Sequence, residues 1–427
     1  MTNIKIDNSE RNIAVIGAGI IGINCALELQ SLGFQVTLID KAGIGEGCSK
    51  ANAGHFATEQ VFPLAEPNLL WQFPKLLLDP LGPVSLSASY FPKALPWFGQ
   101  FIINMVASKR AKNSSALTAL NKNAINYYKP LLKEVKAENL LTLKGSLLVF
   151  ENSSNKTIER QYMRYKNAGV KVILLDRQQT LLLEPNLSKT ICASIYFTDV
   201  GHSINPLEIC TKLAALAFQK GCLFHQDEVL HISHSKIGTS LTTTKNTLQF
   251  DQVVIATGAW SKKLIEPLGY KLPIEAERGY SLDLPPCKTE SQLSRPVASA
   301  ERKFIITPMA HGLRLAGTVE YAGLNKGPNM KRADMLFKNA QHVLTKLPEY
   351  DPENAKHSQK WMGHRPSMPD SLPVIGQAPK HENIYFSLGH QHLGLTQGAI
   401  TGKIIGQLIC KQKTEIDISP FCISRFN

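Results

Sequence analysis

The chain has 427 residues, of which 43% are hydrophobic and 19% charged, as expected for a globular protein of two or more domains. The formal net charge of +13 at pH 7 favours anionic partners, but the lysines are spread along the chain, so no nucleic-acid partner is expected. No apolar run reaches the roughly 20 residues of a transmembrane helix, and the polar N-terminus has no apolar export core. We expect a cytoplasmic protein, with peripheral attachment to the inner face of the cytoplasmic membrane as the alternative.

The first 40 residues predict a strand–helix–strand unit. Residues 12–16 form an apolar run typical of a buried strand, and the glycine-rich turn 17–22 (GAGIIG) follows directly. A helix is expected from this turn to about residue 32, and a second strand, 35–39, ends at Asp40. A lone GxGxxG turn is weak evidence, but here both strands, the helix and the acid are in register.

The glycines and the acid of this unit each have a physical role in binding a dinucleotide. Gly17 permits the tight turn, Gly19 lets the backbone approach a pyrophosphate, and Gly22 lets helix and strand pack closely. The helix N-terminus favours the anion, and Asp40 can accept hydrogen bonds from a ribose. The alternative is a glycine-rich turn in some other α/β fold.

A second small-residue segment, 43–54, follows the second strand. Its glycine, serine and alanine residues offer backbone N–H groups with little steric bulk, which suits a long cofactor that lies extended past the strand. The same composition is compatible with a flexible surface loop, so composition alone does not choose between NAD and FAD.

The N-terminal unit, together with Ser49-x-Ala51-Asn52-Ala53-Gly54, resembles the D-amino-acid oxidase/glycine oxidase superfamily of flavoproteins. Within it the chain is most similar to bacterial D-amino-acid dehydrogenase of the small-subunit type. The resemblance extends over essentially the whole chain. Further matching segments are Gly201-His202-x-x-Asn205-Pro206, Thr257-Gly258-Ala259-Trp260, Arg278-Gly279-Tyr280, Gly363-x-Arg365-Pro366 and Gly389-His390-x-x-x-Gly394.

The resemblance implies an α/β protein with a Rossmann-type FAD-binding domain and an interleaved α+β substrate domain built on an antiparallel sheet. The FAD-binding domain would be discontinuous, with residues 1–58, 199–270 and 361–427. Residues 59–198 and 271–360 would form the substrate domain. Local signals agree with this layout: Asn205 is a good helix N-cap with Pro206 at the first helical position, and 251–256 is a second buried strand. Residues 227–229 are also expected to form a strand.

The resemblance also assigns the site residues, carried over position by position. The expected FAD contacts are Gly17, Ala18, Gly19, Ile20, Ile21, Gly22, Asp40, Lys41, Ser49, Asn52, Ala53, Gly54, Val229, Thr257, Gly258, Gly363, Arg365, Gly394 and Leu395. The expected catalytic residues are Arg365, Tyr280 and His390. No metal is expected, because His390 and His392 cannot share a helix face and no carboxylate cluster lies near them in sequence.

Arg365 is the expected partner of the substrate carboxylate, because a guanidinium offers two parallel charge-assisted hydrogen bonds. The alternative is a structural arginine that pairs with Asp370. Oxidases of the family often carry another arginine after a strand that matches 304–307; this chain has Pro308 and Met309 there. Arg314 either substitutes for it or alternates outward on its strand.

Two features concern the cofactor and its electron acceptor. The flavin-linking cysteine of the sarcosine-oxidase branch is absent near Gly363, so noncovalent FAD is expected. Residues 68–110 are rich in aromatics, including Trp71 and Phe73, and after Pro96 the spacing predicts one amphipathic helix from 97 to 112 with basic residues at its end. Such a helix either lies in a membrane interface or packs on the substrate domain. The dehydrogenase branch passes electrons to a quinone or respiratory partner.

We therefore expect FAD-dependent oxidative deamination of a D-amino acid or related imino acid, with hydride transfer to the flavin. The alternatives are an amine, glycine or sarcosine oxidase that uses oxygen, and an RNA-modifying flavoprotein, for which the +13 charge is the supporting feature. A noncatalytic assembly factor is a further class.

Overall fold

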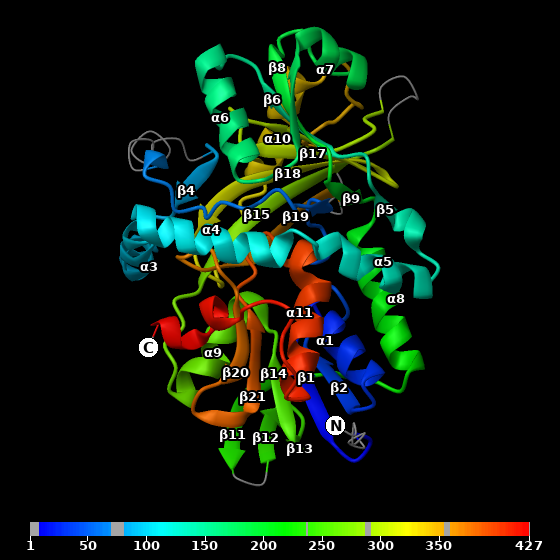
Figure 1. Ribbon diagram of the computed structural model, residues 1–427, viewed down its shortest axis with the longest axis vertical. Coiled ribbons are helices and arrows are strands. Elements are labelled where there is room, and N and C mark those ends of the chain that lie inside the picture. Colours follow the sequence, from blue (N-terminus) through cyan, green and yellow to red (C-terminus); the bar gives the residue numbers. More distant parts are fainter. Residues whose placement is uncertain (1–7, 70–80, 236–237, 287–291, 354–358, 427) are drawn as a thin grey trace.

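The computed structural model describes residues 8–69, 81–235, 238–286, 292–353 and 359–426, and Trp71 and Phe73 lie outside this part. It consists of two lobes, each built around one large sheet, with a belt of helices between them (Figure 1). The lobes are interleaved in sequence, because strands of both sheets come from the N-terminal, middle and C-terminal parts of the chain. The mixed α/β architecture that the sequence predicted is confirmed.

The lower lobe in Figure 1 contains a six-stranded sheet whose order is β10-β2-β1-β14-β21-β20. The strands are β10 (Leu223–Gln226), β2 (Gln35–Asp40), β1 (Asn12–Ile16), β14 (Gln252–Ile255), β21 (His381–Leu388) and β20 (Val374–Ala378). The first five are parallel, and β20 is antiparallel to β21. Such parallel strands need both faces covered, which explains their continuous apolar runs.

Both faces of the central strands of this sheet are covered, and the two cores draw on alternate residues of these strands. Ile13 and Val15 of β1 pack with helices α1 (Ile20–Ser31), α8 (Pro206–Gln219) and α11 (Gly394–Ile409). Ala14 and Ile16 face a second core. That core includes residues of β11 (Val229–Ser235), β12 (Gly238–Thr243), β13 (Thr247–Phe250) and α9 (Ser261–Ile265).

Most local predictions for this lobe are confirmed. The strands predicted at 12–16 and 35–39 are present, and Asn205 caps α8 by accepting a hydrogen bond from the Glu208 N–H at 3.2 Å. The strand predicted over 227–229 is wrong at its start, because β11 begins only at Val229. The Asp227 carboxylate instead accepts from the Glu228 N–H at 2.8 Å, and residues 227 and 228 are not part of a strand.

The upper lobe is built on a nine-stranded sheet with the order β19-β15-β18-β17-β16-β6-β8-β7, in which β4 also pairs with β18. The strands are β4 (Val84–Leu86), β6 (Ser146–Phe150), β7 (Val172–Asp176), β8 (Ala193–Phe197), β15 (Glu275–Leu284), β16 (Val297–Ser299), β17 (Phe304–Met309), β18 (Gly312–Tyr321) and β19 (Lys360–Ser367). All neighbours are antiparallel except β16–β6 and β18–β4. Helices α6 (Asn155–Asn167), α7 (Arg177–Leu183) and α10 (Lys331–Val343) lie in the same lobe.

The position of strand β19 concerns the domain boundary expected at residue 361. The boundary at residue 361 falls inside β19, which pairs along its whole length with β15 of the nine-stranded sheet. We propose that the substrate lobe extends to Ser367 and that the C-terminal part of the FAD-binding lobe begins after it.

The belt between the lobes contains α3 (Phe91–Ile103), α4 (Ala107–Asn121), α5 (Ala124–Glu134) and a small sheet of β3 (His55–Phe56), β9 (Gly201–Ser203) and β5 (Leu141–Thr142). The single helix predicted over 97–112 is wrong. Two helices occupy this region, because α3 ends where Asn104 folds its side chain back onto the Gln100 carbonyl at 2.9 Å, and Val106 is extended.

Candidate functional site

A cavity of about 370 Å³ lies beside the carboxyl ends of the central parallel strands. The three glycines of the first turn have different surroundings there. A Cβ on Gly17 would lie 2.5 Å from the Ala256 carbonyl oxygen, and one on Gly22 would lie 1.8 Å from the Gly17 carbonyl oxygen. A Cβ on Gly19 would meet only the Ser49 hydroxyl, at 3.4 Å, and Gly19 lines the cavity. The first and third glycines are therefore needed by the fold, and the second leaves room for a ligand.

The turn is held in shape by two side chains from the next segments. The Asp40 carboxylate accepts hydrogen bonds from the N–H groups of Ala18 at 2.8 Å, Ala42 at 2.7 Å and Gly43 at 3.1 Å. The Ser49 hydroxyl accepts from the Ile20 N–H at 2.9 Å at the start of α1. Asp40 and Ser49 also line the cavity, so they shape the site as well as border it.

Most of the expected cofactor residues surround this cavity. The residues that line it are Gly17, Gly19, Ile20, Ile21, Asp40, Lys41, Ser49, Val229, Thr257, Gly258 and Gly394. Ala18 and Gly22 do not line it; they are buried in the turn and in the packing of α1. The arrangement of glycine turn, helix N-terminus and acid fits a dinucleotide with its pyrophosphate at Gly19.

A second cavity, of about 550 Å³, adjoins the first and extends between the two lobes; we call it the inner cavity. The two share Ile20, Cys48, Ser49, Gln391 and Gly394, so a long ligand can pass from one into the other. Of the expected site residues, the inner cavity adds Asn52, Ala53, Tyr280, Gly363, Arg365 and Leu395. One wall is the nine-stranded sheet, and another is the segment from Cys48 to Gln60.

The Asn52–Gly54 turn needs its residue types. The Asn52 side chain accepts from the Gly54 N–H at 2.8 Å and donates to the Ser49 carbonyl at 3.0 Å. Gly54 has φ +66°, and a Cβ there would lie 2.5 Å from the Ser203 carbonyl oxygen. Gly54 thus shapes the loop, although it is not part of the cavity surface.

Arg365 is on β19, and its side chain reaches the neighbouring strand β15. Its Nη1 is 2.8 Å from Oε1 of Glu277, the residue directly opposite it, and the side chains are 23% and 7% exposed. A Cβ on Gly279 would be 2.2 Å from the guanidinium, so the missing side chain at 279 makes room for it. In the part of the chain that the structure describes, Nε and Nη2 of Arg365 have no bonded partner, which leaves two donors for a ligand.

A β-bulge in β18 faces this arginine. The register between β15 and β18 shifts between Arg278 and Tyr280, and Thr318 there has φ +54°. This conformation is strained for a β-branched residue and is concentrated at functional sites. It turns the Thr318 carbonyl toward Arg365 Nη1, at 3.4 Å, and places Thr318 on the inner cavity wall. Sequence reasoning missed this residue, because nothing in the local pattern of β18 signals a bulge.

Arg314 does not lie in the position expected for a carboxylate clamp. It is buried and makes a bidentate pair with Asp283 at 2.7 Å for both bonds, and its Nη1 donates to the Asn52 carbonyl at 3.0 Å. Arg314 therefore ties the Asn52 loop to the sheet. The alternative pairing of Arg365 with Asp370 is also wrong, since Asp370 pairs with Arg425 at 2.7 Å.

The other two expected catalytic residues are engaged elsewhere. The Tyr280 hydroxyl donates to Glu320 Oε2 at 2.5 Å and accepts from the Asn329 N–H at 3.1 Å, within the network of the buried Arg278. His390 is buried, with Nε2 3.1 Å from the Thr401 hydroxyl, and burial lowers its pKa to about 3. Both border the cavities but use these polar atoms for structure, so direct catalytic roles for them stay predictions.

Three side chains at the cavities were not anticipated as site residues. Trp361 lies over Gly363, where a Cβ would be 2.0 Å from its ring, so Gly363 makes room for this indole. Cys48 borders both cavities; its thiol donates to the His364 carbonyl at 2.6 Å, and burial raises its pKa to about 12. Lys303 lines the inner cavity, and burial lowers its pKa while Glu301 and Glu66 oppose that shift.

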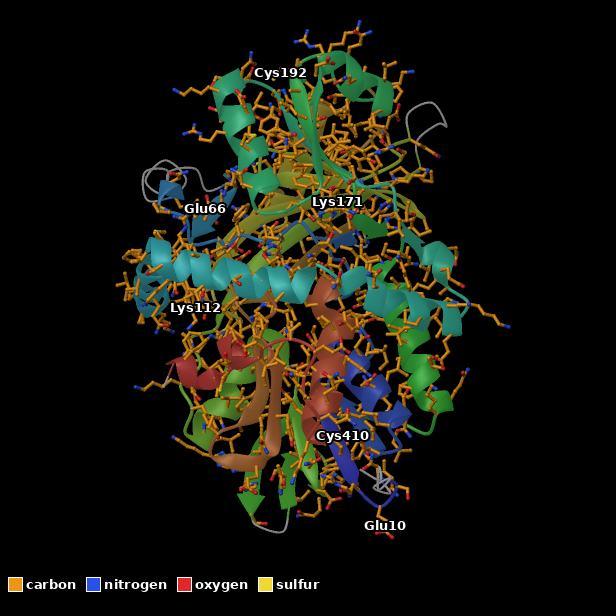
Figure 2. All side chains as sticks on the ribbon, in the orientation of Figure 1. Glu10, Glu66, Lys112, Lys171, Cys192 and Cys410 are labelled. Carbon is orange, nitrogen blue, oxygen red and sulfur yellow. The ribbon has the colours of Figure 1, made fainter. Side chains whose placement is uncertain are left out.

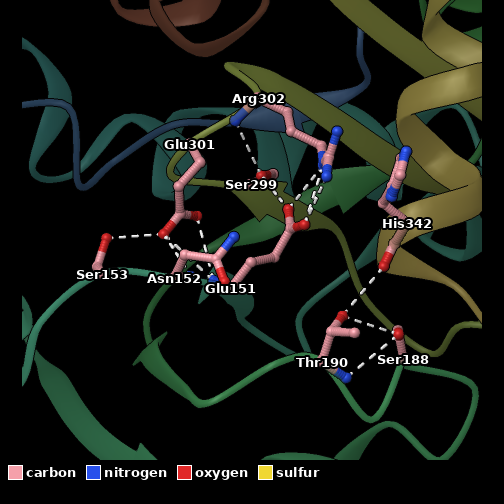
Figure 3. A network of polar contacts seen from close by, with 9 residues as sticks. All are labelled: Glu151, Asn152, Ser153, Ser188, Thr190, Ser299, Glu301, Arg302 and His342. Carbon is pink, nitrogen blue, oxygen red and sulfur yellow. Dashed lines mark hydrogen bonds and ion pairs between the residues drawn. The ribbon is translucent and has the colours of Figure 1, made fainter.

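The turn that presents Lys303 is braced by charged side chains (Figure 3). Glu151 accepts from Arg302 Nε and Nη2 at 2.8 Å each, and Ser299 donates to the same carboxylate at 3.3 Å. Glu301 accepts from the Ser153 hydroxyl at 2.7 Å on the other side. Because both flanks are fixed, the turn holds Lys303 at the wall of the inner cavity.

The fold and the paired cavities are those of a flavin-dependent oxidoreductase, and comparisons with known proteins agree. A model of the DAO family, described as FAD dependent oxidoreductase, matches residues 12–408. The chain belongs to this family, and its cofactor is FAD. The resemblance inferred from the sequence motifs is confirmed.

Curated relatives cover nearly the whole chain. A D-amino-acid oxidase of Bradyrhizobium diazoefficiens is 34% identical over 421 residues, with 97% of this chain and 99% of the relative covered. A D-amino acid dehydrogenase of Vibrio cholerae is 29% identical, with 93% and 94% covered. Glycine oxidase from Geobacillus kaustophilus has the same fold, with a TM-score of 0.73 at 22% identity and 97% and 99% of the chains covered.

Proposed function

We propose that this enzyme oxidises a D-amino acid, or a related imino acid, at the carbon that bears the nitrogen. The observation that carries the proposal is Arg365, which lines the inner cavity and whose Nε and Nη2 have no bonded partner among the described residues. The D-amino-acid oxidase and dehydrogenases among the relatives support this substrate class.

The chain's own groups orient the substrate. Arg365 binds the carboxylate by a two-point, charge-assisted contact. Glu277 and the Thr318 carbonyl, both bonded to Nη1, hold the guanidinium in place. FAD held at Gly19, Asp40 and Ser49 would supply the hydride-accepting chemistry for the substrate carbon. The product imine hydrolyses in water, so the protein supplies mainly orientation.

Anaerobic bleaching of the flavin tests the substrate class. Purified enzyme should lose its flavin absorbance with one or more D-amino acids or cyclic imino acids, and the L-enantiomers should react at least about tenfold more slowly, because only one enantiomer places its α C–H toward the flavin when Arg365 holds the carboxylate. The panel includes glycine and N-methyl amines. Bleaching by these alone, or by no amine, contradicts the proposal.

We further propose that α3 lies on an anionic membrane surface and that electrons leave to a quinone or another respiratory acceptor. No helix in the described part of the chain is long and apolar enough to cross a membrane. The exposed large apolar side chains of this region are Phe91, Leu95, Ile102, Ile103 and Val106. Exposed Lys93, Lys109 and Lys112 accompany them, and Figure 2 shows Lys112 on α4 in this belt.

The membrane proposal has a matched pair of variants. Ile103 is 54% exposed, so Ile103→Asp should release the enzyme from phosphatidylglycerol vesicles while leaving Tm nearly unchanged. Phe101 lies in the segment for which the sequence left a membrane interface and packing on the substrate domain open; it is only 7% exposed and stacks on Trp97. Phe101→Asp should therefore lower the free energy of unfolding by several kcal/mol, because it buries an unpaired charge.

Failure of the wild type to bind vesicles in a flotation assay contradicts the membrane proposal. Rapid peroxide formation in air contradicts the proposal of a quinone or other respiratory acceptor.

A further inference from the structure

One polar pair in the inner cavity has no role in the fold or in the proposed chemistry. His55 lies in β3, directly after Gly54, and Glu59 follows four residues later; both line the cavity. His55 Nε2 is 2.8 Å from Glu59 Oε1, and the side chains are 14% and 10% exposed. A carboxylate is thus held largely away from solvent at the wall of a substrate-sized cavity.

The outer atoms of this pair are unsatisfied. Oε2 of Glu59 and Nδ1 of His55 are buried and have no hydrogen-bond partner among the described residues. The same is true of the Thr318 hydroxyl on another wall of the cavity. Buried polar groups in native proteins are almost always paired, so unpaired ones at a cavity indicate a ligand that completes them.

Neighbouring titratable groups do not compensate the carboxylate. His202 of β9 lies directly opposite His55, and burial lowers its pKa to about 4, so it is neutral at pH 7. His392 is exposed to the cavity, and desolvation by the surrounding atoms lowers its pKa, which favours the neutral form. Tyr165 of α6 is also within electrostatic reach of Glu59 and carries no positive charge. Lys303 interacts instead with Glu301 and Glu66.

The His55–Glu59 pair and Arg365 line the same inner cavity. His392 projects from the loop before α11 into the inner cavity, and both the Arg365–Glu277 pair and the His55–Glu59 pair act electrostatically on its ring. The cavity therefore offers a cationic group on β19 and a carboxylate on the segment after Gly54. This is a complementary set for a ligand that carries both charges.

We propose that the His55–Glu59 pair is a subsite for a positively charged nitrogen group of the substrate, on a different wall of the inner cavity from Arg365. The inference rests on the proposed amino-acid substrate. The nitrogen is either the α-ammonium group or a cation at the end of the side chain, and both offer N–H donors to Oε2 of Glu59. His55 is a positioning residue that holds the carboxylate through Oε1.

Two matched pairs of inert carboxylates distinguish these sources. 2-Aminoisobutyrate has an α-ammonium group but no α-hydrogen, and pivalate is its uncharged counterpart at that position. 5-Guanidinopentanoate has a side-chain cation but no α-amino group, and heptanoate is its apolar counterpart. Binding to the FAD-loaded enzyme is measured by perturbation of the flavin spectrum and by calorimetry.

The wild type should prefer the charged member of at least one pair by about tenfold or more, as expected for a charge-assisted hydrogen bond away from water. Glu59→Gln keeps an acceptor for His55 but removes the charge, and it should abolish that preference. Glu266→Gln, which removes a similar charge from an exposed pair with Lys262 at 3.5 Å, should retain it.

Each outcome of the binding measurements leads to one conclusion. Loss of preference in the aminoisobutyrate pair assigns the α-ammonium group, and loss in the guanidino pair assigns a side-chain cation. Equal binding of charged and uncharged members by the wild type overturns the inference, and so does a preference that survives Glu59→Gln. If the preference depends on Glu59 but no amino acid bleaches the flavin, the subsite stands and the proposed function falls.

Discussion

Gly19→Val should yield folded protein that retains no flavin. A Cβ at this position meets only the Ser49 hydroxyl, at 3.4 Å, and φ is −73°, so the fold tolerates a side chain. The valine methyl groups would then occupy the place where the pyrophosphate approaches the start of α1. The measurement is the ratio of flavin to protein absorbance, together with circular dichroism and Tm.

Two comparisons make this result specific. Gly99→Val, on α3, has nothing within 4 Å of the new Cβ and should keep its flavin. Gly22→Ala should fail to fold, because its Cβ would lie 1.8 Å from the Gly17 carbonyl oxygen. Acid precipitation of the wild type should release free FAD, since the protonated Cys48 thiol is a poor nucleophile and no cysteine is present at Gly363. A yellow Gly19→Val protein, or flavin in the acid pellet, would contradict these expectations.

Arg365→Ala should lower kcat/KM for the amino-acid substrate by roughly tenfold to a hundredfold, the equivalent of about 1.5–3 kcal/mol for a lost charge-assisted pair. The structure adds a second effect. Glu277, only 7% exposed, would lose its partner, and breaking a buried pair from one side costs about 3–5 kcal/mol of stability. Steady-state kinetics and thermal unfolding are therefore measured together.

A double variant distinguishes the effect of Arg365→Ala on kcat/KM from its effect on stability. Adding Glu277→Gln removes the unpaired charge, so stability should largely return while kcat/KM stays low. Arg365→Lys should keep the pair with Glu277 but not the two-point contact with a carboxylate, and it should remain impaired. Recovery of kcat/KM in the double variant would show that Arg365 acts only through Glu277, and the substrate assignment would be wrong.

The sequence alone was sufficient for the nucleotide site. A strand, a glycine turn, a helix and an acid within 30 residues specify one local geometry, because glycine spacing and the 3.6-residue period act over neighbouring positions. Gly17, Gly19 and Asp40 were assigned from this pattern, and the structure places all three at the cavity. The helix cap at Asn205 follows from an equally local rule.

The substrate side depended on tertiary structure, because its residues meet only through the pairing of strands distant in sequence. Nothing near Arg365 in sequence identifies Glu277 as its partner; the β15–β19 register does. Contacts between segments distant in sequence also decide the bulge at Thr318, the use of Arg314 to hold the Asn52 loop, and the unpaired oxygen of Glu59. Hydrophobic periodicity showed that residues 97–106 have an apolar face. Only the packing of Trp97 and Phe98 against Tyr321 decided which apolar side chains are covered and which remain exposed, because periodicity gives a direction around a helix axis but not the surface that meets it.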